Sequence, residues 1–215
     1  MHTPLPFMDQ LGPERSKVFD KLSAFSNRFV LAGGTAIMLQ IGHRLSYDFD
    51  CFCESELPPT LLRQAKKVFG RFIFPRIHTA DQISFSATPG VEITFVYHPY
   101  PPLKPKISTS SLPLFHLDDL AANKAYVIGR RGVWRDYVDI FFLLKWKLYD
   151  IPGIIDLAEK KFTGEFNPKL FLEQLTYFSD LQIVPIEFLK EPHSPPEIQS
   201  FLENQTESYI KKILP

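Results

Sequence analysis

The sequence predicts an α+β fold, in which a mixed β-sheet flanked by helices is followed by an all-helical C-terminal half. Short apolar runs separated by Gly and Pro fill the first half, and they have the length and alternation of strands. Residues 99–113 are rich in Pro and Ser and cannot form a regular helix. After them, apolar residues recur at helical spacing. We therefore expect an αβ domain at residues 1–113 and a helical domain packed on it at residues 114–215.

The first elements follow one another in a definite order. Charged residues separate apolar ones at helical spacing over residues 14–26, which predicts a helix. The apolar run at residues 29–32 predicts a buried strand that ends in a tight turn at Gly33 and Gly34. Residues 35–41 are apolar all round and predict a short buried helix.

Residues 47–53 predict a strand in which Asp48 and Asp50 share one face, while Phe49 and Cys51 share the other. A helix and three strands complete this half, at residues 58–70, 72–77, 82–87 and 91–97. After the Pro-rich stretch only helices are expected, at about residues 117–129, 133–148, 152–162, 167–178 and 195–213.

Composition limits the class of protein. The chain has 215 residues, of which 45% are hydrophobic and 22% charged, so it can bury a core. Its formal net charge is zero, and any nucleic-acid binding must therefore use a local basic patch. Cys51 and Cys53 lie two apart on one strand, which suits neither a mutual disulfide nor zinc and predicts two buried thiols. With no signal pattern and no long apolar stretch, we expect a cytoplasmic protein without a membrane span.

Three acidic residues are candidates for metal binding. Asp48 and Asp50, on one strand face, present the hard oxygen ligands that Mg²⁺ prefers. Glu92 is the one acid in an otherwise apolar strand, and it would join them if the two strands are neighbours. Three such carboxylates repel one another unless a cation offsets their charge. The alternative is a polar strand face, or an edge strand, open to water.

The Gly33–Gly34–Thr35 turn is a candidate phosphate site. A strand that ends in two glycines and leads into a helix brings backbone N–H groups close to a ligand, and the helix N-terminus favours an anion. Thr35 could cap the helix or donate to a phosphate. A purely structural turn is the alternative, since many strand–helix connections need a positive φ.

A run of four basic residues without an acid could grip phosphates: Lys124, Arg130, Arg131 and Arg135. Asp136, which follows on the next predicted helix, could anchor Lys124 or Arg131. A solvated helix face is the alternative interpretation of these charges.

Two segments, in this order, resemble the AbiEii/AbiGii toxin family of the nucleotidyltransferase superfamily, which includes MenT-type toxins. Residues 31–50 (LAGGTAIMLQIGHRLSYDFD) are similar to its opening motif, a Gly-Gly or Gly-Ser turn, a helix and an Asp-x-Asp strand. Residues 122–144 (ANKAYVIGRRGVWRDYVDIFFLL) are similar to its later motif, with a Lys, an Arg-Gly and an Arg-Asp-x-x-Asp. The resemblance spans roughly residues 28–148 and implies a nucleotidyltransferase-type sheet.

The resemblance also implies roles for individual residues. The implied catalytic residues are Asp48, Asp50, Glu92, Lys124 and Asp136. The implied nucleotide-binding residues are Gly33, Gly34, Lys124 and Arg131, and Thr35 joins them as the residue of the turn that could donate to a phosphate. The implied metal ligands are Asp48, Asp50 and Glu92.

The activity that the resemblance implies is Mg²⁺-dependent (or Mn²⁺-dependent) transfer of a nucleoside monophosphate from an NTP to an acceptor hydroxyl. The chain would be the toxin of a toxin–antitoxin pair, with RNA, tRNA among the candidates, as acceptor and a cognate antitoxin as protein partner. Two alternatives stay open. One is a catalytically silent module of the same fold that binds a partner protein. The other is nucleotidyl or phosphoryl transfer to a protein or a small molecule.

Overall fold

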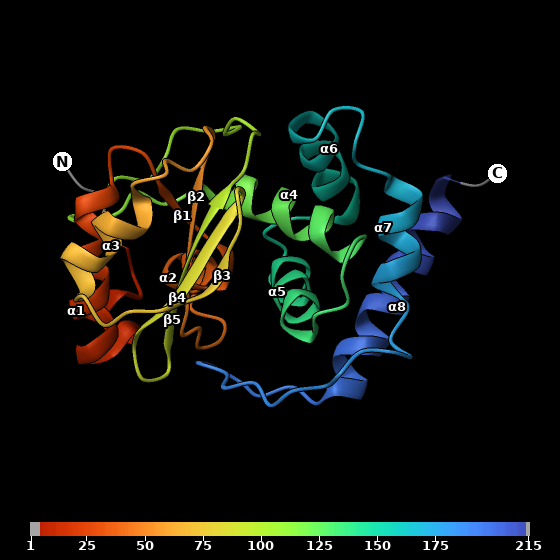
Figure 1. Cartoon of the computed structure of the whole chain (residues 1–215). Helices are drawn as coiled ribbons and strands as arrows, with labels where there is room; N and C mark the ends of the chain where they lie inside the picture. The colour runs from red at the N-terminus through yellow and green to blue at the C-terminus, as the bar shows by residue number, and fades with distance from the viewer. Residues whose placement is uncertain (1–4, 214–215) are drawn as a thin grey trace. The chain divides into compact units, whose positions relative to one another are not determined.

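The structure, a computed structural model, describes residues 5–213 and separates into two compact units (Figure 1). The first unit comprises residues 1–116 and the second residues 117–215. The sequence-based boundary, after Pro113, lies in the stretch just before this division.

The first unit alternates helices and strands. Its helices are the 3₁₀ turns η1 (Met8–Leu11) and η2 (Ser23–Phe25) and the α-helices α1 (Gly12–Leu22), α2 (Gly33–Ile41) and α3 (Leu61–Phe69). Its strands are β1 (Val30–Ala32), β2 (Phe49–Cys53), β3 (Pro75–His78), β4 (Gln82–Thr88) and β5 (Val91–Tyr97). The expected helix over residues 14–26 is thus shorter and ends in a 3₁₀ turn.

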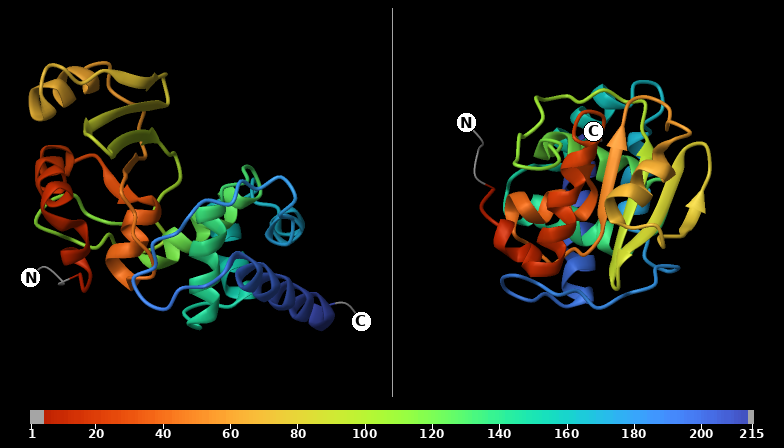
Figure 2. Two further views of the ribbon diagram at one scale, coloured as in Figure 1. Left: turned by 90° about the horizontal axis from the view of Figure 1, so that it is seen from below. Right: turned by 60° about the vertical axis from the view of Figure 1, so that its left-hand side comes forward.

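The five strands form one mixed sheet in the order β1-β2-β5-β4-β3. The pair β2–β5 is parallel, whereas β1–β2, β4–β5 and β3–β4 are antiparallel. The predicted α+β fold class is confirmed. β3 is an edge strand, the yellow arrow at the right of the right-hand view in Figure 2.

One predicted strand begins later than expected. The apolar residues 72–77 predicted a strand, but β3 starts only at Pro75, which pairs with Phe85 of β4. Beyond Phe85, β4 pairs with β5 alone, so Phe72 and Phe74 have no strand opposite them. The prediction of a strand from residue 72 was therefore wrong at its start. Phe72 and Phe74 are apolar, but both rings face solvent.

The core of the first unit is aromatic and lies on one face of the sheet. Phe19 of α1 stacks on Phe49 of β2, with ring centroids 6.0 Å apart. The ring centroid of Phe25, in η2, lies 4.9 Å from that of Phe95, in β5. Figure 1 shows α1 and α3 lying together beside the sheet. Each fully buried ring contributes about 1.5–3 kcal/mol through the hydrophobic effect. The same face carries Cys51, which like Cys53 is a buried free thiol as predicted.

The second unit consists of five α-helices within the described residues, as predicted. They are α4 (Leu117–Ile128), α5 (Trp134–Lys145), α6 (Ile151–Lys161), α7 (Pro168–Leu175) and α8 (Pro195–Ile213). The starts of α6 and α7 are capped: the side chain of Asp150 accepts from the N–H of Gly153 and that of Asn167 from the N–H of Leu170. α8, the long blue helix in the left-hand view of Figure 2, contacts α5, α6 and α7.

Over residues 5–213, no helix combines the length and the apolar character that a membrane crossing requires.

Candidate functional site

Asp50 lies on the polar face of β2, as predicted, two residues after Asp48 in the chain. Phe49 and Cys51 are fully buried on the core side, whereas Asp50 is partly exposed on the other. Because β2 and β5 run in parallel register, Asp50 lies opposite Thr94. Asp48 directly precedes β2, and its Oδ1 accepts a hydrogen bond of 3.0 Å from the backbone N–H of Glu92. The two acid-bearing strands are therefore neighbours, joined at Asp48.

The Glu92 side chain does not join the aspartates in a cluster. Its carboxylate pairs instead with the guanidinium of Arg76, which reaches from β3 across β4. Among the described residues 5–213, no three His, Cys, Asp or Glu side chains gather as metal ligands would. The two strands are neighbours, which was the condition for the three acids to converge, but Arg76 supplies a positive charge to Glu92. The metal-binding role of Glu92 stays a prediction.

The glycine turn lies directly against Asp50. Gly33 has a φ of +65°, and a Cβ at this position would overlap the Asp50 carboxylate. A Cβ on Gly34 would come within 2.7 Å of Nη2 of Arg44 and 2.9 Å of Oγ of Ser46. A side chain at either position would therefore displace a neighbouring side chain, and at Gly33 it would also meet the left-handed backbone. The carboxylate of Asp50 thus lies beside the N-terminus of α2, where a negative charge is favoured.

Thr35 ties the turn to the acid strand. Its side chain is buried, and its hydroxyl donates a 2.5 Å hydrogen bond to the backbone carbonyl of Asp48. The residue before the helix, Ala32, has only a methyl side chain, which cannot cap it. Thr35 therefore fixes the position of Asp48 relative to the turn, and the phosphate-binding role expected for Thr35 stays a prediction.

Asp48 and Asp50 suit a hard divalent cation. Mg²⁺ in proteins commonly takes one or two carboxylates and completes its shell with waters and substrate phosphates. The first unit offers two carboxylates two residues apart, and that of Asp50 lies next to a glycine turn at a helix N-terminus. The donor set fits a metal that is held jointly with a bound nucleotide.

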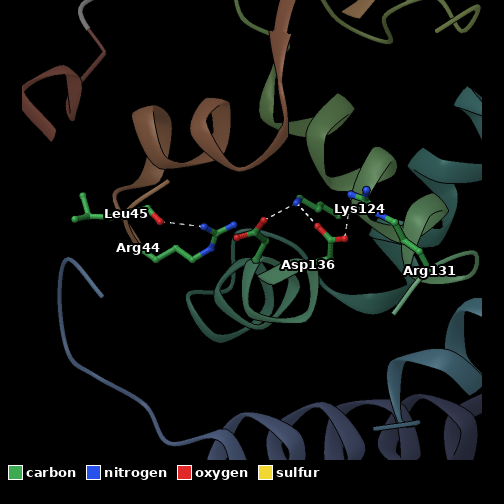
Figure 3. Close-up of polar contacts among 6 residues, drawn as sticks. Arg44, Leu45, Lys124, Arg131 and Asp136 are labelled. Atoms are coloured by element: carbon green, nitrogen blue, oxygen red, sulfur yellow. Dashed lines mark hydrogen bonds and ion pairs between the residues drawn. The ribbon is translucent and has the colours of Figure 1, made fainter. Parts of the chain in front are cut away.

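The second unit holds a buried cluster of charges around Lys124 (Figure 3). Nζ of Lys124, on α4, lies 2.5 Å from Oδ1 of Asp136 and 2.6 Å from Oδ2 of Asp139, both on α5. All three side chains are buried. The amine is therefore held by two carboxylates and is not part of a solvated helix face.

Arg131 extends from this cluster into solvent. Its side chain is 61% exposed, and its Nη2 lies 3.3 Å from Oδ2 of Asp136. As predicted, Asp136 anchors both Lys124 and Arg131. An exposed guanidinium that contacts a carboxylate through one nitrogen keeps other N–H donors that can bind an anion such as a phosphate.

The structure thus forms two groups from the predicted residues. The first unit brings together Gly33, Gly34, Thr35, Asp48 and Asp50, and the second brings together Lys124, Arg131 and Asp136. Sequence reasoning missed Arg76 as the partner of Glu92, because that pair depends on the register of β3, which no local pattern reveals.

The mixed five-stranded sheet belongs to a fold shared with solved structures that are assigned as nucleotidyltransferases. Residues 18–214 of the chain match the family described as "Nucleotidyl transferase AbiEii toxin, Type IV TA system". The chain belongs to this family, which confirms the resemblance seen in the two motifs.

The chain is also similar to individual proteins, one in sequence and two in fold. The chain is 28% identical over 212 residues to the uncharacterized protein aq_aa25 of Aquifex aeolicus (strain VF5), covering 95% of this chain and 100% of that protein. MenT4, a nucleotidyltransferase toxin from Mycobacterium tuberculosis H37Rv, has a similar fold, with a TM-score of 0.59, 16% identity, and coverage of 96% of this chain and 88% of that one. A crystal structure of an H. pylori protein assigned as a nucleotidyltransferase gives a TM-score of 0.56, with 16% identity and coverage of 92% and 93%.

Proposed function

We propose that the chain transfers a nucleoside monophosphate from an NTP to an acceptor hydroxyl, at the site formed by the glycine turn and the polar face of β2. The observation that carries the proposal is the contact of Gly33 with Asp50, in which a helix N-terminus and a carboxylate meet with no side chain between them. The N-terminal turn of α2 suits a phosphate, and the adjacent carboxylates suit the cation that accompanies it.

In the proposed reaction, the acceptor oxygen attacks the α-phosphorus of the NTP. A new bond forms between that oxygen and the phosphorus, and the bond to the bridging oxygen breaks, so that pyrophosphate leaves with the electron pair. The hydroxyl proton passes to a carboxylate of the site, and Glu92 helps to orient the attacking hydroxyl. Mg²⁺ (or Mn²⁺), held by Asp48 and Asp50, would neutralise charge on the phosphates.

Residues of the turn keep the site in position. Thr35 holds the carbonyl of Asp48, and Asp48 in turn holds the N–H of Glu92. The phosphate-binding role of Arg131 and the catalytic roles of Lys124 and Asp136 are part of the proposal, supported by the family motif and by their mutual ion pairs.

We further propose that the acceptor is RNA, with tRNA as one candidate, and that a cognate antitoxin restrains the activity. The family description names a type IV toxin–antitoxin system, and MenT4 is a nucleotidyltransferase toxin. The two free thiols suit the reducing cytoplasm, where we place the protein.

The direct test uses purified protein, each α-labelled NTP, Mg²⁺ and total RNA. Asp48→Asn and Asp50→Asn are expected to abolish label transfer, because each removes a carboxylate charge that would hold the cation. Each variant keeps an amide oxygen that can still accept a hydrogen bond. Asp81→Ala, at an exposed acid in the turn between β3 and β4, is the matched control and should transfer label as the wild type does.

Three outcomes would contradict parts of the proposal. Label transfer by none of the four NTPs would remove RNA nucleotidyl transfer, and a silent binding module would then be favoured. Unchanged transfer by both asparagine variants would remove the site. Label found on a protein or a small molecule would replace RNA as the acceptor.

A further inference from the structure

A basic segment crosses the first unit from α3 to β3. Residues 57–80 contain no Asp or Glu, although the whole chain has equal numbers of acidic and basic residues. The segment contains five basic residues, Arg63, Lys66, Lys67, Arg71 and Arg76. The surface that they occupy is therefore locally positive, which suits an anionic partner.

Two large rings project into solvent from this segment. The side chains of Phe72 and Phe74 are 74% and 71% exposed, in a protein whose other aromatic side chains mostly lie in the core. Cζ of Arg71 lies 4.8 Å from the centroid of the Phe72 ring, and Nζ of Lys66 lies 6.0 Å from that of Phe74. Each exposed ring is thus accompanied by a cation.

Two contacts link this segment to the candidate site. Arg76, in the strand that follows Phe74, pairs with the carboxylate of Glu92. The backbone N–H of Glu92 donates to Asp48. The basic segment and the acids are therefore joined through Glu92.

We propose that Phe72, Phe74, Arg71 and Lys66 form a binding platform for single-stranded RNA. Bases stack on the exposed ring faces and phosphates pair with the cations, a combination that serves single strands of any sequence because every base has a flat face. The platform rests on the proposed function for its purpose, since it would guide an RNA acceptor to the site. Its binding of RNA requires neither nucleotide nor metal.

The geometry of β3 disfavours a protein partner that would add a strand to this edge. β3 has only four residues, begins with Pro75, which lacks an N–H, and is irregular between Pro75 and Ile77. These are features that prevent edge-to-edge pairing. The alternating rings and cations favour a nucleic acid instead.

The test is fluorescence anisotropy of a short labelled single-stranded RNA with the full chain, without NTP or divalent metal. The double variant Phe72→Leu/Phe74→Leu should weaken binding about tenfold or more, because Leu keeps the apolar surface but cannot stack. Phe72→Tyr/Phe74→Tyr should restore the affinity. Lys66→Gln/Arg71→Gln should weaken binding and flatten its dependence on salt.

Matched controls lie in the second unit. Tyr177 is also an exposed aromatic residue, and Lys169 is an exposed cation, so Tyr177→Leu and Lys169→Gln should bind RNA as the wild type does. A thermal shift with NTP and Mg²⁺ should be the same in the leucine variant and the wild type.

The outcomes separate this inference from the proposed function. RNA binding that is absent, or undiminished in the leucine variant, overturns the platform even if label transfer occurs. Ring-dependent RNA binding without label transfer supports the platform and leaves the chemistry to be replaced. If the leucine variant binds RNA normally but escapes inhibition by a co-expressed antitoxin, the surface is a protein site and the proposal is overturned.

Discussion

The contact between Gly33 and Asp50 decides at the scale of single residues whether the site can form. The turn needs both a positive φ and the absence of a side chain, and these two requirements can be separated experimentally. Gly90 shares the positive φ, at +77° against +65°, but a Cβ there would meet nothing within 4 Å. The two glycines therefore form a matched pair, one with steric conflict and one without.

Gly33→Ala is expected to lower the free energy of unfolding more than Gly90→Ala does. Both variants acquire backbone strain of about 1–2 kcal/mol in the left-handed region. Gly33→Ala must in addition displace the Asp50 carboxylate, which should add about 1–3 kcal/mol, as overpacking usually does. Urea denaturation of the two variants measures the difference. Equal losses would show that Asp50 moves freely, and the contact would then not define the site.

Residue-scale predictions from sequence succeeded where local periodicity decides them. The alternation of residues 47–53 correctly predicted Asp50 on the polar face and Phe49 on the core face. The burial of both thiols was also predicted correctly. The partner of Glu92 could not be predicted from the sequence. Arg76 reaches Glu92 only because of the register in which β3 pairs with β4. The sequence likewise did not reveal that Phe72 and Phe74 are exposed and lie outside a strand.

At the scale of elements, Lys124 joins α4 to α5. Its ammonium is buried between Asp136 and Asp139, so removing it would leave two carboxylates in a poorly solvated place. A second buried pair, Lys161 with Asp119 at 2.6 Å, joins α6 to α4 in the same unit. The second pair provides a structural control for the first.

Lys124→Met and Lys161→Met are each expected to lower the free energy of unfolding by about 3–5 kcal/mol, because each leaves buried charge without its partner. Lys124→Met/Asp136→Asn/Asp139→Asn should recover much of the stability. At a temperature where every variant is folded, nucleotide transfer should be lost in both variants that lack Lys124 and kept in Lys161→Met. Transfer by the triple variant would show that Lys124 acts only as a structural residue.

Elements with strong periodicity were predicted best. Each of the five helices of the second unit appears in its expected region, because apolar spacing and clear stop signals define them. The mixed sheet was predicted, but the order of its strands was not. Whether β2 pairs with β5 or with β3 depends on tertiary contacts that local sequence patterns do not reveal. The roles of the site residues stay predictions at this scale too.

For the whole molecule, buried weak acids in both units predict how stability depends on pH. Burial raises the pKa of Tyr137 to about 12, and it raises the pKa of Cys51 and of Cys53. Burial, with the hydrogen bond to Asp118, also raises the pKa of Tyr149. In each case the neutral form is favoured by folding, so the stabilisation is present below the pKa of the unfolded chain and is lost as pH rises towards the folded value.

The free energy of unfolding is therefore expected to fall above about pH 9, by up to about 1.4 kcal/mol per pH unit for each group that ionises on unfolding. Urea denaturation at a series of pH values measures the slope. Tyr137→Phe should flatten the slope between about pH 10 and pH 12, the window between the unfolded and folded pKa values of this tyrosine. Tyr177→Phe, at an exposed site, should leave it unchanged. A free energy that stays constant from pH 9 to 11 would contradict the expectation.

The parallel pairing of β2 with β5 has a consequence for how relatives can diverge. Because both strands start at the same edge of the sheet, the chain leaves the site after β2 and returns to it at Glu92. The excursion between them, through α3, β3 and β4, carries the exposed rings and the basic residues. Changes in the length or composition of this segment would alter the proposed ligand-binding surface and leave the aspartates in place. In the proposed function, the choice of ligand and the chemistry thus belong to different segments of the first unit, which can diverge separately.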